Sequence, residues 1–282
     1  MESTARGRVV LVTGGSAGIG RSTVTRLARD GAQVVTCARG GERLRQAVGA
    51  LPGVSTVVAD VADAADRDRL LDRVLDEHGR LDAVVLNAGL GWAGLVEDMP
   101  GDAVERLIGL NLTGVVELTR IALPHLFGAA AQRGRADVVT VASAAAWSQV
   151  PPLTVYSATK AGVHGFVKGL RREVTARGVR VHTVNPGPVQ TEWLARGHGS
   201  PPVSDDDARS RLSRGISPDR VAGQIAGCLT SPWSRTVAVP RWMGLARLGE
   251  VPPVDRVLDL VLSRQADRIR RVAARMVEER TG

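Results

Sequence analysis

The sequence predicts an α/β protein with a doubly wound parallel sheet that carries helices on both faces. From the amino terminus to about residue 185, short apolar runs bounded by Gly, Asn, Asp and Ser alternate with stretches of helical period. The apolar runs are rich in Val and do not alternate with polar residues, as is typical of strands buried on both faces. The 282 residues, of which 44% are hydrophobic, suffice for the core of one domain with an appendage.

The elements follow in order from these patterns. The expected strands are 9–12, 33–37, 55–58, 83–86, 137–141, 179–184 and 236–239. Helices fill the gaps, the long ones at 104–131 and 156–177, and Pro218 opens a further helix that ends near Leu229. Residues 187–216, with several Gly and Pro and an acidic run, predict a substrate loop or lid. We therefore expect a dinucleotide-binding and catalytic domain at 1–240 and an amphipathic helical extension at 241–282, with apolar residues at helical spacing from 254 to 276.

Composition narrows the class of protein. Cys37 and Cys228 form no CxxC pair and the five histidines have no ligand spacing, so neither a disulfide framework nor a metal site is expected. The sequence has no signal-peptide pattern and no apolar run that approaches a membrane span, which favours a cytoplasmic location. The net charge of +8 comes from arginines spread along the chain without interleaved aromatics, so no nucleic-acid partner is expected.

Tyr156 is the only tyrosine, and Lys160, four residues later, is one of only two lysines among 37 lysines and arginines. Because nearly all other cationic side chains of this protein are arginines, a lysine at this position indicates a need for a compact ammonium group. Residues i and i+4 lie on one helix face, so the ammonium would lie beside the phenol. A neighbouring cation favours phenolate, so we expect the pKa of Tyr156 to fall from about 10 to roughly 7, where it suits a general acid or base. The alternative is a coincidental pairing on a helix.

A glycine-rich turn follows the first expected strand. It has the sequence TGGSAGIG at 13–20 and leads into an amphipathic helix that begins near Gly18. Glycines at 14, 18 and 20 allow a tight turn, close approach to a pyrophosphate and packing of the helix against the strand. The start of the helix supplies free amides and a positive dipole end for phosphates. The turn predicts a dinucleotide site with Gly14, Ser16, Ala17, Gly18 and Ile19 among its residues.

The end of the second strand bears on which dinucleotide binds. In such sites an acid at this place accepts hydrogen bonds from the adenosine ribose, whereas a 2′-phosphate requires a cation. Position 38 is Ala and Arg39 follows, which favours NADP over NAD; the alternative is that Arg39 is an ordinary surface arginine. Asp60 and Val61 follow the third strand, where a carboxylate and a backbone amide would meet the adenine. For Asp60 the alternative is a helix cap.

In this order the motifs resemble those of the short-chain dehydrogenase/reductase family, in its single-domain branch with a carboxyl-terminal extension. The resemblance covers about residues 7–240 and rests on TGGSAGIG at 13–20, Asp60, Asn87-Ala88-Gly89, Asn111, Ser143, Tyr156 with Lys160, and Pro186-Gly187 followed by Val189 and Thr191. Two positions depart from it. Leu86 stands where the family often has a second Asn, and Ala17 where NADP-dependent members often have a basic residue, so the NADP assignment depends mainly on Arg39.

The resemblance implies a Rossmann-type fold and an NAD(P)-dependent oxidoreductase that interconverts a carbonyl and an alcohol. Tyr156 would be the general acid/base, Lys160 would also hold the nicotinamide ribose, and Ser143 would hydrogen-bond the substrate oxygen unless it only forms a turn. Asn111, polar within the apolar run 107–112, would hold a water in a proton relay to the lysine. The other cofactor contacts implied are Asp60, Val61, Asn87, Ala88, Gly89, Pro186, Gly187, Val189 and Thr191.

The expected substrate pocket is mostly apolar and has no fixed cation for a carboxylate or phosphate. Its wall is expected to contain Trp92, Ser143, Ala145, Trp147, Gln149 and Leu153, with the loop after Pro186. This favours NADPH-dependent reduction of a hydrophobic ketone or aldehyde. The alternatives are a ketoacyl-thioester reductase of the same family and a catalytically silent NADP-binding regulatory or scaffold protein.

The family resemblance also implies a homodimer or homotetramer. The apolar stripe of the terminal helix is expected to be core or subunit contact. The preceding Trp242-Met243 leaves peripheral membrane contact as an alternative.

Overall fold

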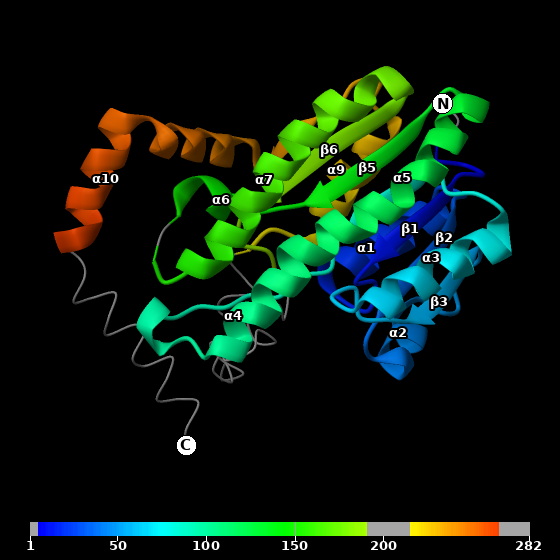
Figure 1. Cartoon of the computed structure of the whole chain (residues 1–282), viewed down its shortest axis with the longest axis horizontal. Helices are drawn as coiled ribbons and strands as arrows, with labels where there is room; N and C mark the ends of the chain where they lie inside the picture. Colours follow the sequence, from blue (N-terminus) through cyan, green and yellow to red (C-terminus); the bar gives the residue numbers. More distant parts are fainter. Residues whose placement is uncertain (1–4, 150, 191–214, 265–282) are drawn as a thin grey trace.

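The computed structural model describes residues 5–149, 151–190 and 215–264. Thr191, most of the expected loop 187–216 and the end of the expected terminal helix lie outside these residues. The centre of the protein is a seven-stranded parallel sheet with the strand order β3-β2-β1-β4-β5-β6-β7 (Figure 1). The predicted fold class, a doubly wound sheet with helices on both faces, is confirmed.

All seven strands were expected, and each end lies within two residues of its predicted position. Their bounds are β1 Val9–Thr13, β2 Gln33–Ala38, β3 Val54–Val58, β4 Ala83–Leu86, β5 Ala136–Val141, β6 Val179–Pro186 and β7 Thr236–Val239. The α-helices are α1 Gly18–Arg29, α2 Gly41–Val48, α3 Ala64–His78, α4 Gly101–Ile108, α5 Gly114–Arg133, α6 Ala145–Ser148, α7 Thr154–Val174, α9 Pro218–Thr230 and α10 Pro252–Arg264. Short 3-10 segments are η1 Val96–Asp98, η3 Thr175–Arg177 and η5 Arg241–Glu250.

The single long helix expected at 104–131 is wrong in one respect. It consists of α4 and α5, joined by the π-helical turn η2, Gly109–Thr113. A π turn inserts an extra residue into the helix and so rotates the side chains that follow it. Asn111 lies in this turn and is fully buried.

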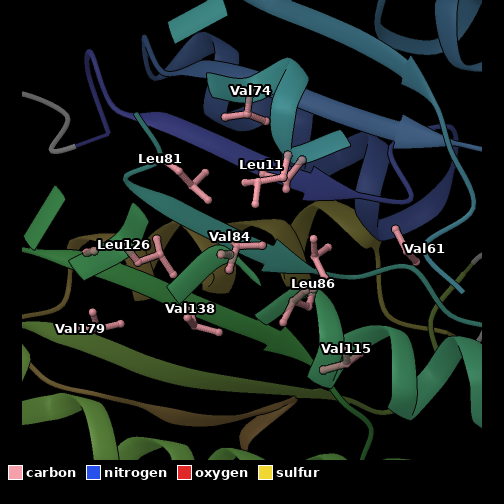
Figure 2. Packing of buried hydrophobic residues seen from close by; sticks show 14 of the residues in the cluster. Leu11, Val61, Val74, Leu81, Val84, Leu86, Val115, Leu126, Val138 and Val179 are labelled. Carbon is pink, nitrogen blue, oxygen red and sulfur yellow. The ribbon is translucent and has the colours of Figure 1, made fainter. Parts of the chain in front are cut away.

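The helices form two layers, one on each face of the sheet. Apolar side chains of α1, α2 and α9 pack on one face, and those of α3, α5 and α7 pack on the other. Leu11, Val84 and Val138 are register partners in three adjacent strands, and Figure 2 shows them beside Leu126 of α5. The sheet is thus buried on both faces, which explains why its strands are continuously apolar.

The stretch Gly101–Arg133 is long and apolar enough to cross a membrane by length and composition. Its α5 part, however, buries Leu118, Ala122 and Leu126 against the sheet, as the core helix of a globular domain does. We therefore find no clear transmembrane span among the described residues.

A buried cluster of charges ties the amino-terminal ends of three strands together. The carboxylate of Asp137 in β5 accepts hydrogen bonds from Arg8 before β1 (2.7 Å), from Arg135 (2.8 Å to each oxygen) and from His182 in β6 (3.0 Å). Burial by itself raises the pKa of Asp137, but the hydrogen bonds from His182 and Arg135 and the charge of Arg8 outweigh it and lower the pKa. Asp137 is therefore ionised and fully paired at neutral pH.

Asp137→Asn should lower the free energy of unfolding by about 3–5 kcal/mol, because it leaves the buried Arg8 and the half-buried Arg135 without their counter-charge. The pKa of Asp137 is lower in the folded than in the unfolded chain, so its contribution is complete above about pH 4 and is lost as pH falls further. Urea unfolding at pH 7 measures the change. In the control Asp30→Asn, which breaks the partly exposed pair with Arg26, the change should stay below about 1 kcal/mol; equal effects would contradict the role of the cluster.

Candidate active site

The glycine turn between β1 and α1 is shaped by close backbone contacts. The amides of Gly14 and Gly15 donate to the carbonyl of Cys37 in β2 (2.9 and 3.1 Å). Gly14 and Gly18 have positive φ angles of 77° and 51°, which favour glycine. A Cβ on Gly20 would lie 2.0 Å from the carbonyl oxygen of Gly14, so only glycine fits there. The spacing of glycines in the sequence therefore has a direct steric cause.

The end of β4 is hydrogen-bonded to this turn. The hydroxyl of Thr13 accepts from the backbone amides of Asn87 and Ala88 (3.0 Å each), and the side-chain amide of Asn87 donates to the carbonyl of Thr13 (2.9 Å). Leu86, where the family often has a second Asn, is buried in the core. Asn87 and Ala88 thus connect the glycine turn to the end of β4.

A cavity of about 430 Å³ opens beside the glycine turn. It is lined by Ser16, Ala17, Gly18, Arg21, Ser22, Arg43, Gln46, Ala47, Gln190 and Pro218. Arg21 and Arg43 were missed by the sequence analysis. Their signal was present, since Arg21 directly follows the glycine motif and Arg43 lies in the first turn of α2, but only the fold brings both to this cavity. The cavity thus combines free helix-start amides, small residues and two cations, which suits a dinucleotide phosphate.

Arg39 and Asp60 lie at the ends of β2 and β3. Arg39 is exposed directly after Ala38, which pairs with Val58 of β3. The carboxylate of Asp60 accepts from the backbone amide of Ala62 (3.0 Å) and forms an ion pair with Arg106 of α4. The alternative that Asp60 caps the following helix is wrong, because Asp63 is the N-cap of α3.

Asn111 is held by the loop after β4. Its Oδ1 accepts from the backbone amide of Leu90 (2.8 Å), and its Nδ2 donates to the carbonyl of Leu90 (2.9 Å) and to Thr159 of α7 (3.2 Å). Gly89 lies between this amide and the lysine, because a Cβ there would be 3.1 Å from Asn111 Oδ1 and 3.5 Å from Lys160 Nζ. The buried asparagine therefore links three segments that surround the lysine.

Ser143, Tyr156 and Lys160 meet at the carboxyl end of β5. The hydroxyl of Ser143 is hydrogen-bonded to Tyr156 and accepts from the backbone amide of Ala145 (3.1 Å). Lys160 Nζ lies 5.8 Å from the centre of the Tyr156 ring and donates to the carbonyl of Val141 (3.2 Å). The three residues that sequence analysis named as the catalytic core are thus neighbours in space.

The expected low pKa of Tyr156 is wrong for the protein alone. Burial raises the pKa of Tyr156 to about 12, although its hydrogen bond with Ser143 acts in the opposite direction. Burial also lowers the pKa of Lys160 to about 8. Desolvation disfavours the charged form of both groups and is the largest cause of both shifts. The phenol is therefore protonated at neutral pH, the form that donates a proton, and the lysine titrates close to that range.

The residues expected in the substrate wall are arranged in two groups. Trp92 is buried and belongs to one apolar cluster with Tyr156, Met99 and Leu107. Leu153 lies against the same group. Ala145 and Trp147 lie in α6. Gln149 directly follows this helix with a positive φ of 37°, and its side-chain amide donates to the carbonyl of Ala146 (2.6 Å).

The segment after β7 also lies at this site, which sequence analysis missed. η5 packs against α6, and the guanidinium of Arg247 lies 4.4 Å from the ring of Trp147. Met243 fills the space beside Gly187, where a Cβ would be 2.1 Å from its sulfur. The expectation of a wall without a cation is therefore wrong at Trp147. No local pattern could have shown this contact, because the two residues are a hundred positions apart.

Pro186, Gly187 and Val189 connect the sheet to the substrate side. The carbonyl of Pro186 accepts from the amide of Ala144 (2.9 Å), and the amide of Gly187 donates to Val239 (2.8 Å). Val189 forms an isolated bridge with Ile216, where the described chain resumes. Among the described residues, no group of three or more His, Cys, Asp or Glu side chains could hold a metal ion.

Comparison with known proteins agrees with this geometry. The short chain dehydrogenase family matches residues 8–198. A putative ketoacyl reductase from Streptomyces coelicolor is 33% identical over 238 residues, 79% of this chain and 90% of the relative. A 3-ketoacyl-(acyl-carrier-protein) reductase from Brucella melitensis, complexed with NADH, has a TM-score of 0.74 at 28% identity and covers 83% of this chain and 97% of its own. An alcohol dehydrogenase from Thermococcus sibiricus, complexed with 5-hydroxy-NADP, has a TM-score of 0.71 at 25% identity, covering 82% and 95%.

The chain therefore belongs to the short-chain dehydrogenase family, the class that its parallel sheet, glycine turn and Ser143–Tyr156–Lys160 group define. It has the fold of NAD(P)-binding oxidoreductases.

Lys160→Met should raise the free energy of unfolding by roughly 1–3 kcal/mol at pH 7, because the buried ammonium has a folded pKa of about 8 against an ordinary value near 10.4. The unfolded chain binds more protons between these values, so the wild type gains stability as pH rises from 8 to 10 and the difference between the two proteins shrinks. Urea unfolding at pH 7 and pH 9.5 tests this. The control is Lys168→Met, which alters the exposed lysine of α7 and should leave stability unchanged; the idea fails if both substitutions behave alike.

Gly20→Ala should abolish measurable nicotinamide-dinucleotide binding, because the added Cβ forces the carbonyl of Gly14 out of the turn. Fluorescence titration with NADPH and NADH measures binding, and circular dichroism checks that the protein is folded. Gly128→Ala in α5, where a Cβ meets nothing within 4 Å, is the control and should bind as the wild type does. Wild-type affinity in Gly20→Ala would contradict the steric argument.

Proposed function

We propose that the protein is an NADPH-dependent reductase of hydrophobic ketones or aldehydes in which Tyr156 is the general acid. The observation that carries the proposal is the group formed by the half-buried Ser143 and the buried Tyr156 and Lys160 at the same sheet edge as the glycine turn. A protonated phenol that touches a serine hydroxyl, beside a lysine of lowered pKa, is suited to proton donation to an oxygen that gains charge.

In the proposed reaction each residue of the site has a separate role. The nicotinamide supplies the hydride when it is bound. Ser143 would donate a hydrogen bond to the substrate oxygen and hold it near Tyr156, whose phenol would give up its proton. Lys160, which titrates near pH 8, would stabilise the resulting phenolate and hold the ribose. Asn111 would keep the lysine in place through the Leu90 loop, and a water held there would complete the proton relay.

The remaining cofactor contacts are proposed in keeping with the family. They comprise the turn residues Gly14, Ser16, Ala17, Gly18 and Ile19, the strand-end residues Arg39, Asp60, Val61, Asn87, Ala88 and Gly89, and Pro186, Gly187, Val189 and Thr191 on the nicotinamide side. The substrate would meet Ser143, Ala145, Trp147, Gln149, Trp92 and Leu153.

The choice of NADP is supported by charge. Ala38 leaves no acid at the end of β2, Arg39 follows it, and Arg21 and Arg43 line the adjacent cavity. These arginines would replace the basic residue that NADP-dependent members of the family often have at the position of Ala17. A 2′-phosphate gains from such guanidinium groups, whereas a ribose hydroxyl pair prefers a carboxylate.

A second candidate, reduction of a ketoacyl thioester, is favoured by the likeness to the Streptomyces and Brucella reductases. A catalytically silent protein is disfavoured because Ser143, Tyr156 and Lys160 are all present. Ser143 is hydrogen-bonded to Tyr156, and Lys160 Nζ lies 5.8 Å from the centre of the Tyr156 ring. We further propose a cytoplasmic homodimer or homotetramer. Sedimentation velocity of the full chain tests the assembly.

Arg39→Ala should raise the Kd for NADPH about tenfold and leave the Kd for NADH within about twofold, because one charge-assisted contact to the 2′-phosphate is worth roughly 1.5 kcal/mol. Fluorescence titration measures both values. Arg29→Ala, at the end of α1, is a matched exposed control. Equal weakening of NADPH and NADH would contradict the NADP assignment.

Tyr156→Phe should lower kcat by roughly a hundredfold or more with hydrophobic ketones while NADPH binds normally, since only the proton donor is lost. Steady-state kinetics over a panel of neutral, apolar and charged carbonyl compounds measures the effect. Retained activity would reject the mechanism, and fastest turnover of small charged substrates would reject the substrate class.

A further inference from the structure

The segment from η5 to α10 exposes many apolar side chains in succession. Of the twelve large apolar side chains that are exposed in the described part of the chain, eight lie between residues 242 and 261. Apolar residues scattered singly over a surface are normal, whereas a contiguous apolar patch marks an interaction site. The exposed apolar side chains of residues 242–261 are called the η5–α10 face below.

The part of this face on η5 follows from 3-10 geometry. Side chains at i and i+3 of a 3-10 helix lie above one another. Trp242, Leu245 and Leu248 therefore form one line, and they are 68%, 65% and 55% exposed. The opposite side of η5 faces the domain, where Met243 fills the space beside Gly187. The exposed line is thus the outer side of a helix whose inner side is packed.

The face continues on α10. Val254, Val257 and Val261 are spaced by three and four residues, so they share one side of the helix, and all three are exposed. Leu258 instead reaches η5, because a Cβ on Gly249 would lie 3.3 Å from its Cδ1. Figure 1 shows α10 at one end of the molecule, beyond α6. None of the described residues of α10 is buried, so this apolar stripe is not part of the core.

The charges of α10 are separated between its two sides. Arg264 comes seven residues after Val257, which is about two helical turns, and so lies on the exposed apolar side. Asp255 and Asp259 stand two residues before and two residues after Val257, which places them on the opposite side of the helix. Arg241 is exposed at the start of η5. The η5–α10 face therefore carries arginines, while the aspartates of α10 point away from it.

We propose that the η5–α10 face docks on an anionic lipid surface. Its apolar side chains enter the boundary between headgroups and acyl chains, and Arg241 and Arg264 bind lipid phosphates. Trp242 suits the headgroup region, because its indole is amphipathic. A second copy of the chain fits less well. A twofold contact joins the same face of both copies, so the arginines would meet one another without the aspartates.

The first experiment measures docking of the full chain by flotation with vesicles of equimolar phosphatidylcholine and phosphatidylglycerol. Trp242→Ala/Leu245→Gln should raise the Kd for these vesicles about tenfold or more, because it removes apolar area from the face. The matched control Trp233→Ala/Val96→Gln changes side chains that are 78% and 56% exposed outside the face, and should bind as the wild type does. Circular dichroism checks that both variants are folded. Lack of wild-type binding, or equal losses in both variants, overturns the proposal.

The second experiment tests the charges. Arg241→Gln/Arg264→Gln should weaken binding to the same vesicles about tenfold and leave binding to phosphatidylcholine alone unchanged. The control Arg29→Gln/Arg172→Gln removes two exposed arginines of α1 and α7 and so lowers the net charge by the same amount. It should bind as the wild type does. Equal weakening by both pairs would mean that binding follows the net charge of +8, and would overturn docking through this face.

The third experiment separates a lipid surface from a second copy. Sedimentation velocity should give the same assembly for Trp242→Ala/Leu245→Gln as for the wild type. A smaller assembly in this variant would assign the η5–α10 face to a subunit contact and overturn the proposal. Vesicle binding is measured without turnover, so a failure of the proposed oxidoreductase function would leave these results unaffected.

Discussion

The parallel alignment of all seven strands is the constraint on which the rest of the protein depends. Parallel strands place their carboxyl ends at one edge of the sheet, so Thr13, Asn87, Ser143 and Pro186 meet although they come from four separate segments. A ligand bound at this edge can therefore be held largely by backbone groups, which lie at the strand ends and at the start of α1.

The two edges of the sheet differ in how charge is treated. At the amino-terminal edge, Asp137 is buried but fully paired with two arginines and a histidine, so it stabilises the fold. At the carboxyl edge, Lys160 is buried and donates to the carbonyl of Val141, and burial lowers its pKa to about 8. The buried lysine thus costs stability where the proposed chemistry would take place, a trade that is common at active sites.

Much of the fold could be predicted from the sequence, because its signals are local. The Val-rich runs gave every strand, and the glycine spacing gave the turn, since each glycine has a steric reason within a few residues. The π turn at Asn111 was not predicted, because periodicity cannot distinguish one long helix from two helices joined by an extra residue. The low pKa expected for Tyr156 is wrong because spacing along the helix shows a neighbouring cation but not the burial that raises the pKa.

The sequence by itself determined the family, the sheet and the candidate group of Ser143, Tyr156 and Lys160, whose types and spacing are short-range properties of the chain. The tertiary structure decided the electrostatics and the outer walls of the site. Arg43 reaches the cavity at the glycine turn, and Arg247 lies on Trp147, because helices distant in sequence pack together. The physical reason is that the type of each helix or strand depends on residues close together in the sequence. Burial and contacts between distant residues arise only when the helices pack onto the sheet.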